Sequence, residues 1–351
     1  MKGQIFNRKA TVGVFCFLFC CLSLRAADVG TTASNFLKIP VAAIPTSLGN
    51  SYTAMIGPDS ILYNPAGLGL LTYPVFSGSH NQYLIGISQE YVAATYRTKL
   101  GTVGVAYSLL RSGNIKSYDL NENPLGTVST SHKQAVISFA QSFPHFNQDI
   151  GMIDPMVITP GWTNIAVVED YRPKAYRISF GGSLKYVGEK LADESSSTYT
   201  FDLGIMLVLP EHLQLGAAVL NLGGSQKFYS SSAKLPRTIR AGVAKDFHSK
   251  KNLMVFTVMS DIVKESDYDL QQSLGFEMSV LNMVQLRLGY KSGKDEGSRL
   301  SGGFGMNFDR FTSPENFING VRLDYSYFDY GVLGATHRFG FQFIWGGGKK
   351  A

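Results

Sequence analysis

The chain has 351 residues, a formal net charge of +6 and a hydrophobic content of 44%. Its three cysteines all lie near the start, at Cys16, Cys20 and Cys21. Removing the four basic residues of the first 26 positions (Lys2, Arg8, Lys9 and Arg25) lowers the charge from +6 to +2. The remaining chain therefore offers no basic cluster that predicts nucleic acid as a partner, and no cysteine for a disulfide or a metal site.

Residues 1–26 have the layout of a secretory signal peptide. Basic residues precede an apolar run from Val12 to Leu24, and the small residues Ala26 and Ala27 follow it. A run of about 13 residues is too short to span a membrane as a helix. We therefore expect an export signal at 1–26, with an uncleaved anchor or a lipoprotein signal at Cys20 or Cys21 as alternatives.

Residues 27–72 do not alternate between apolar and polar side chains. A segment of this length suffices to plug a wide barrel, so we expect a hatch, with a flexible periplasmic tail as the alternative. The segment ends in an Asn-Pro turn, since asparagine before proline favours turn initiation. We assign the gating element of the hatch to this turn, with an ordinary turn into the barrel as the alternative; its residues are Asn64, Pro65, Ala66 and Gly67.

Residues 73–345 contain about 14 strand candidates, each near the ~9–11 residues that a tilted membrane strand needs. The candidates lie near 73–81, 86–97, 100–111, 132–143, 174–189, 197–209, 212–222, 237–248, 251–262, 270–281, 283–292, 298–309, 319–330 and 334–345. Short turns on one side alternate with long polar loops on the other, as in bacterial barrels. The stretch 144–173 breaks this pattern, and we expect a periplasmic-side insertion there, with a missed strand pair as the alternative.

The last strand candidate shows the side-chain pattern most clearly. Large aromatics occupy one face, at Phe339, Phe341, Phe343 and Trp345, and Arg338, Gly340 and Gln342 occupy the other. A barrel in lipid turns apolar residues outward and polar residues toward a wet interior. The expected fold is therefore all-β, a transmembrane antiparallel barrel of about 14 strands in the bacterial outer membrane, with a short C-terminal tail at 346–351.

Charged residues in mid-strand would face the lumen by parity, where burial without a partner is costly. They are Arg177, Lys185, Asp202, Arg240, Glu277, Arg287, Arg299, Arg322, Asp324 and Arg338. We expect them to pair with each other or with the hatch, and Arg322 and Arg338 lie on neighbouring strands with Asp324 in reach. The alternative is a polar wall that steers a carboxylate head group.

Several stretches together resemble the FadL-like outer-membrane transporters, and more closely their PorV/PorQ branch. The pattern from Ala33 to Leu68 comes first, and the later matches are Leu215–Gly223, Leu235–Gly242, Leu286–Tyr290, Leu323–Tyr327 and Gly334–Arg338. Two stretches depart from the branch, Ile44-Pro45-Thr46 and the 144–173 insertion. The resemblance implies a 14-strand barrel with an N-terminal hatch. FadL-like members move long-chain fatty acids or other hydrophobic molecules, whereas PorV-like members hold cargo for a protein secretion system.

The end of the chain also resembles the signal read by the barrel-assembly machinery, with Gly340, Phe343 and Trp345 at the matching positions. No enzyme is expected, because the six histidines are scattered without a metal-binding spacing, and no cofactor is expected. We predict passive uptake of a hydrophobic small molecule, with a PorV-like partnership with secretion-system proteins as the alternative and a purely structural barrel as a third possibility. We expect outer-membrane lipid to surround the barrel.

Overall fold

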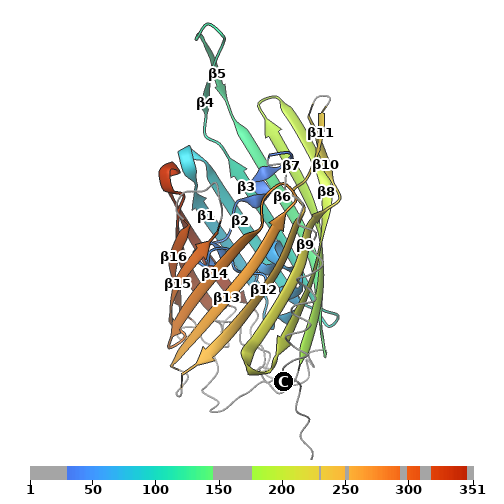
Figure 1. Ribbon diagram of the computed structural model, residues 1–351, viewed down its shortest axis with the longest axis vertical. Helices are drawn as coiled ribbons and strands as arrows, with labels where there is room; N and C mark the ends of the chain where they lie inside the picture. Colours follow the sequence, from blue (N-terminus) through green and yellow to red (C-terminus); the bar gives the residue numbers. More distant parts are fainter. Residues whose placement is uncertain are drawn as a thin grey trace, which may run out of the picture.

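The computed structural model describes residues 30–144, 176–228, 231–249, 253–292, 299–308 and 318–345. Within them, fourteen strands form a closed antiparallel barrel (Figure 1). The predicted signal peptide, the C-terminal tail and all but the first residue of the 144–173 insertion lie outside the described residues. The predicted fold class is confirmed.

The barrel strands lie within about three residues of the predicted segments. They are β1 (Val75–Gln82), β2 (Ser88–Arg97), β3 (Thr102–Arg111), β6 (Thr130–Phe143), β7 (Arg177–Leu191), β8 (Glu194–Leu209), β9 (Leu213–Leu222), β12 (Thr238–His248), β13 (Met254–Glu265), β14 (Gln271–Val280), β15 (Val284–Lys291), β16 (Leu300–Asn307), β17 (Ile318–Asp329) and β18 (Ala335–Trp345). Strand β18 pairs with β1 and closes the barrel, so no strand edge is left open.

The longer loops among the described residues gather at one end of the barrel, which is the extracellular end in barrels of this construction. Two of them form hairpins, β4 (Ile115–Tyr118) with β5 (Pro124–Val128), and β10 (Ser225–Phe228) with β11 (Ser231–Lys234). The β4–β5 hairpin projects well beyond the barrel (Figure 1). Two other loops at this end carry short 3-10 turns, η3 (Leu84–Gly86) and η6 (Gly331–Leu333), and η4 (Pro210–His212) lies in a tight turn at the opposite, periplasmic end.

The outer face of the barrel is apolar and the inner face is polar. On β18, Phe339 is 58% exposed whereas its neighbour Arg338 is fully buried, and β8 exposes Phe201 and Leu203 while it buries Asp202. Aromatic side chains also pack across neighbouring strands on the outside, as Phe304 does with Tyr325. In water this surface would be a large exposed apolar patch, whereas a bilayer covers it. None of the described helices is long and apolar enough to span a membrane.

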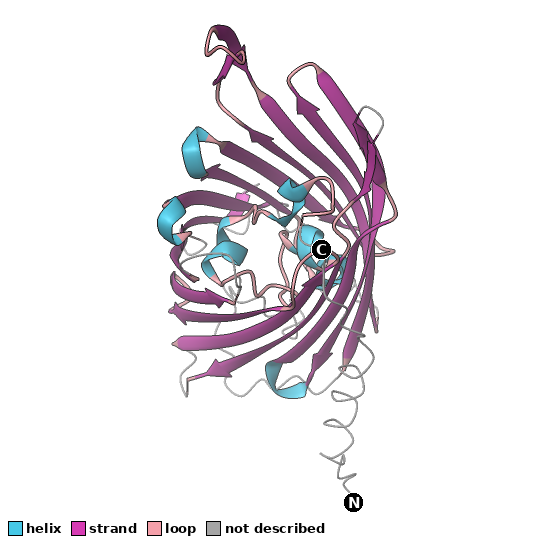
Figure 2. Ribbon diagram, turned by 45° about the horizontal axis from the view of Figure 1, so that its top comes forward, coloured by secondary structure: helices cyan, strands magenta, loops and turns pink. Residues whose placement is uncertain are grey.

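The N-terminal segment fills the barrel instead of trailing from it (Figure 2). It forms four short helical turns, η1 (Asn35–Lys38), α2 (Ala43–Ser47), α3 (Ser60–Tyr63) and η2 (Pro65–Leu70). From Val41 to Leu71 nearly every residue is buried, and its apolar side chains form the main hydrophobic cluster with small inward residues of the wall. We call residues 30–72 the hatch.

Candidate functional site

The hatch runs from the extracellular end of the lumen to the periplasmic end, where β1 begins. At the extracellular end the backbone N–H of Ala33 donates to the carbonyl of Lys234, 2.9 Å away. In the loop after β13, Asp267 accepts hydrogen bonds from Thr32 (2.6 Å) and Lys38 (2.8 Å). The extracellular loops therefore hold the start of the described hatch.

The hydrogen bonds of Thr32 and Lys38 to Asp267, which we call the tether, lead to a testable prediction. Burial opposes the charge on Asp267, but hydrogen bonds from Lys38 and Thr32 and the Lys38 charge lower the pKa of Asp267 below its ordinary value. The folded pKa is depressed, so the stabilisation is complete above about pH 4 and is lost as the pH falls below that. We expect Asp267→Asn to weaken the tether by about 2 kcal/mol.

Hydrogen exchange of the backbone amides in residues 33–39 measures this change. The control is Asp119→Asn, in the exposed turn between β4 and β5, where the carboxylate binds only its own turn. Equal protection of residues 33–39 in both variants would rule out the tether.

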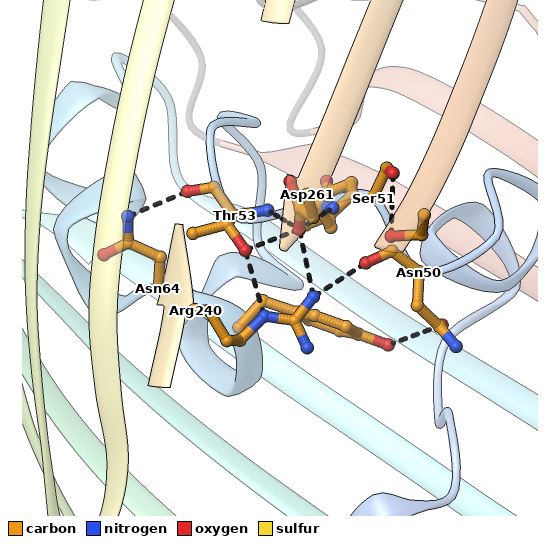
Figure 3. Close-up of polar contacts among 9 residues, drawn as sticks. Asn50, Ser51, Thr53, Asn64, Arg240 and Asp261 are labelled. Carbon is orange, nitrogen blue, oxygen red and sulfur yellow. Dashed lines mark hydrogen bonds and ion pairs between the residues drawn. The ribbon is translucent and has the colours of Figure 1, made fainter. Parts of the chain in front are cut away.

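The centre of the hatch is anchored to the wall by one buried ion pair (Figure 3). Arg240 of β12 lies 3.0 Å from the Asp261 carboxylate of β13. The same Asp261 oxygen accepts from the backbone N–H groups of Tyr52 (3.0 Å) and Thr53 (2.9 Å) and from the Thr53 hydroxyl (2.5 Å). Arg240 in turn donates to the Asn50 carbonyl (2.7 Å). The pair thus satisfies hatch donors and acceptors that would otherwise be buried without partners.

The predicted gating turn lies against the neighbouring strands β7 and β8, and only β9 separates β8 from β12. The Asn64 amide donates to the carbonyls of Thr53 (2.8 Å) and Ile205 (3.1 Å), while its oxygen accepts from the Ala66 N–H (3.2 Å). The Ser179 hydroxyl of β7 donates to the Ala66 carbonyl at 2.7 Å. Asn64, Pro65, Ala66 and Gly67 are all buried. The gating role of this turn stays a proposal.

Wall glycines make room for this turn. A Cβ added at Gly181 would lie 2.4 Å from the Ala66 nitrogen and from the Pro65 carbonyl carbon, both backbone atoms. A Cβ at Gly204 would lie 2.0 Å from the Asn64 side-chain oxygen. By contrast, a Cβ at Gly182, on the outward face, meets nothing nearer than 3.7 Å. The inward glycines therefore allow the hatch backbone to touch the sheet directly.

Nearly all of the charged residues predicted to face the lumen are buried inside the barrel, and most are paired. Arg287 bridges Glu277 (2.6 Å) and Asp324 (2.8 Å), and Arg322 also reaches Asp324 (3.1 Å). Lys185 lies 2.6 Å from Asp202. The expected pairing around Asp324 thus forms with Arg322 and with Arg287.

Three of the predicted arginines lie apart from these networks. Arg338 is buried, but it donates to the Thr336 hydroxyl (2.8 Å) and to the hatch carbonyl of Pro40 (3.3 Å) instead of to Asp324. Arg177 is buried at the start of β7. Arg299 lies one residue before β16 and is half-buried at the extracellular end.

Sequence reasoning missed Asp261, the residue that holds the hatch most directly. The alternation that would have identified it is blurred on β13, because the inward positions beside it hold Met259 and Val263, which read as outward residues in a membrane barrel. Met259 belongs to the main hydrophobic cluster, which the hatch forms with the wall. A plugged barrel therefore breaks the simple polar-inside rule wherever the plug is apolar.

Gly340, Phe343 and Trp345 lie on β18, which pairs with both β1 and β17. Gly340 faces inward, where an added Cβ would lie 3.1 Å from the hatch residue Ala43. Phe343 packs against Phe341 with their ring centres 5.1 Å apart, and the backbone N–H of Trp345 donates to the Pro74 carbonyl. A role in barrel assembly remains a prediction for these three residues.

Two cavities adjoin the extracellular half of the hatch. The inner one is small, about 70 Å³, and it is lined by Arg240, Lys185, Tyr63 and their neighbours. The outer one is open and measures about 710 Å³. Its lining combines apolar Phe36, Ile39 and Leu110 with polar His132 and Gln226. Cavities of about 300–1,000 Å³ that combine apolar walls with a few polar groups are typical small-molecule sites.

No protein-family model matches the chain, and no curated protein matches it. Among solved structures it is similar to the CymD monoaromatic hydrocarbon channel at 10% identity and to the deltaS2 mutant of the TodX monoaromatic hydrocarbon channel at 12%. Each has a TM-score of 0.50, and each match covers 87% of this chain and 97% of the other. The toluene transporter TbuX of Ralstonia pickettii is 12% identical with a TM-score of 0.49, over 87% of this chain and 98% of that one.

At these identities the likeness concerns the fold alone. The chain has the fold of the CymD and TodX channels, a closed antiparallel barrel of 14 strands, and its N-terminal segment lies in the lumen. The closed strand ladder and the lipid-facing outer surface fit only a membrane, and barrels of this construction occur in the bacterial outer membrane. The predicted location is therefore confirmed.

Proposed function

We propose that the protein lets a hydrophobic small molecule, such as a long-chain fatty acid, pass the outer membrane without an energy source. The observation that carries this proposal is the open cavity of about 710 Å³ at the extracellular end of a barrel that the hatch fills. CymD and TodX, which share the fold, are monoaromatic hydrocarbon channels. A hydrophobic ligand captured from the cell surface would rest in the cavity until the hatch moves.

The cavity suits a molecule with a long or flat apolar body and one polar end. Phe36, Leu110, Val187 and Leu235 form a buried apolar cluster beside it. His132 and Glu189, which lie 3.4 Å apart, place polar groups in its wall. Because the hatch fills the lumen below, passage requires part of it to shift. The Asn64 turn is our candidate for that shift. It is held to the wall by separate hydrogen bonds, from the Asn64 amide to the Ile205 carbonyl and from the Ser179 hydroxyl to the Ala66 carbonyl, and not by a strand ladder.

Binding to the purified barrel tests this proposal. Leu110→Gln places a polar amide in the apolar wall and should lower the affinity for a fluorescent fatty acid about tenfold, because burial of one leucine contributes about 1.5–3 kcal/mol. Leu120→Gln makes the same change at the fully exposed tip of the β4–β5 hairpin and is the matched control. Displacement of the probe by toluene distinguishes an aromatic ligand from a fatty acid. Equal probe affinity in both variants would exclude the cavity as the binding site.

The second candidate function is a PorV-like role in protein secretion. It is favoured by the projecting β4–β5 hairpin, which exposes four large side chains at Ile115, Tyr118, Leu120 and Leu125. Such apolar side chains beyond the membrane are typical of a protein contact surface. Replacing residues 115–128 with a Gly-Ser linker should release a surface-held partner while fatty-acid binding is retained. Loss of binding with no change in surface-held protein would speak against this role.

A further inference from the structure

Three potential metal ligands converge at the periplasmic end of the barrel, away from the hatch anchor. His212 ends the tight turn between β8 and β9, and Asp246 and His248 lie at the end of β12. The register pairs Leu213 with Lys245, so one further step along the two strands brings His212 opposite Asp246. His248 lies two residues on, on the same face as Asp246. His212 is distant in sequence from Asp246 and His248, and the pairing of β9 with β12 brings it to them.

The geometry is close to that of a metal site. One ligand atom from each of the three side chains lies within 4.8 Å of the other two, and the two imidazole rings are 4.4 Å apart between centroids. Tetrahedral ligands around a zinc ion lie about 3.3 Å from each other, given bonds of about 2.0–2.1 Å. Both histidines are partly exposed, so small rotations of their rings suffice to close the remaining gap.

The carboxylate in this cluster is held as a metal ligand would be. Asp246 is only 4% exposed, and one of its oxygens accepts a hydrogen bond of 2.7 Å from Thr257. Among the described residues, its other oxygen and Nε2 of His248 are buried without a hydrogen-bond partner. A buried polar atom without a partner is costly and calls for a ligand to satisfy it. Thr257 corresponds to the outer-sphere groups that orient metal-binding carboxylates.

Lys245, the residue before Asp246, does not fill this role. Lys245 directly precedes Asp246 on β12, so its side chain points to the opposite face of the sheet. Its Nζ lies 5.7 Å from the centre of the Phe247 ring and 3.7 Å from the Glu211 carboxylate. The open oxygen of Asp246 is therefore left facing the two imidazoles.

We propose that His212, Asp246 and His248 bind one divalent transition-metal ion of the zinc type. Two imidazole nitrogens and one carboxylate oxygen suit zinc, and three protein ligands leave a coordination position for water. The ion would tie the β8–β9 turn to the end of β12. This site is separate from the proposed passage of hydrophobic molecules, because none of its three residues is among those that line the two described cavities.

Metal titration of the full barrel tests the site. The protein is purified without a histidine tag, stripped with a chelator, and titrated with Zn²⁺ by calorimetry and with Co²⁺ by visible absorption. We expect one equivalent to bind, with Co²⁺ bands typical of a low-symmetry nitrogen and oxygen site. Asp246→Asn, which keeps the hydrogen bond from Thr257, and His248→Ala should each weaken binding roughly a hundredfold, and Thr257→Val roughly tenfold.

His337→Ala is the matched control, because this histidine lies near the extracellular end of β18 and hydrogen-bonds Tyr325. It should bind Zn²⁺ like the unchanged protein. Heat-modifiable mobility in electrophoresis verifies that each variant is a folded barrel. The proposal is overturned if the unchanged folded protein binds neither ion, or if the Asp246 and His248 variants bind as tightly as His337→Ala.

Discussion

Gly181→Ala is expected to unseat the hatch and to make the closed barrel leak ions. The new methyl group would meet the Ala66 nitrogen and the Pro65 carbonyl at distances that atoms do not tolerate, and both contacts are with backbone that no side-chain rotation can move away. Overpacking of this kind costs about 1–3 kcal/mol, and rigid contact atoms place it at the upper end. The hydrogen bonds from Ser179 to the turn and from Asn64 of the turn to Ile205 would break as the turn shifts.

Conductance in planar bilayers measures the leak. Gly182→Ala is the control, since it adds the same methyl group one residue away on the outward face, where the nearest atom is 3.7 Å distant. We expect steady ion currents from Gly181→Ala and a closed barrel from Gly182→Ala and from the unchanged protein. Identical low conductance of all three would show that the Asn64 turn does not close the lumen.

Asp261→Ala should loosen the hatch more than any other single change in the wall. It leaves Arg240 buried without its counter-ion and deprives Tyr52 and Thr53 of the acceptor for their N–H groups. Removing one partner of a buried ion pair costs about 3–5 kcal/mol. The free energy that holds the centre of the hatch in place would fall by about this amount, while the strand ladder of the barrel is unaffected.

Hydrogen exchange of residues 43–70 measures the docking of the hatch directly. The double variant Arg240→Met with Asp261→Leu tests whether the unpaired Arg240 charge causes the loosening, because it removes both charges and leaves no buried charge without a partner. We expect faster exchange in Asp261→Ala and partial recovery in the double variant. If the single and double variants exchange equally fast, the orphaned charge is not the cause.

The barrel was predictable from the sequence because its signal is local and repeated. Most strands alternate with a period of two, and a one-residue error in register would expose arginines such as Arg338 to lipid. The hatch could be assigned as a plug only from its length and position, because its turns are four to six residues long and too short for a periodic pattern. Its helices are held by tertiary contacts such as those of Asp261.

The partners of the inward charges were predictable only in part. Spacing along β17 correctly placed Arg322 beside Asp324. The neighbouring strand also suggested Arg338, whose cross-strand partner is Ser326 and which turns to the hatch instead. Arg287 reaches Asp324 across the intervening strand, which sequence spacing does not show. For the same reason the scattered histidines gave no sign that His212 and His248 lie side by side.

A reversible lock on the hatch tests most directly whether it must move for a ligand to pass. The hydroxyl oxygens of the hatch residue Ser51 (Figure 3) and of Ser273 on β14 lie 3.0 Å apart, so cysteines at both positions are placed to form a disulfide. In proteoliposomes, oxidised Ser51→Cys with Ser273→Cys should bind a fluorescent fatty acid but not transfer it, and reduction should restore transfer. The single variants should transfer in both states. Equal transfer by the locked and the reduced protein would contradict passage gated by the hatch.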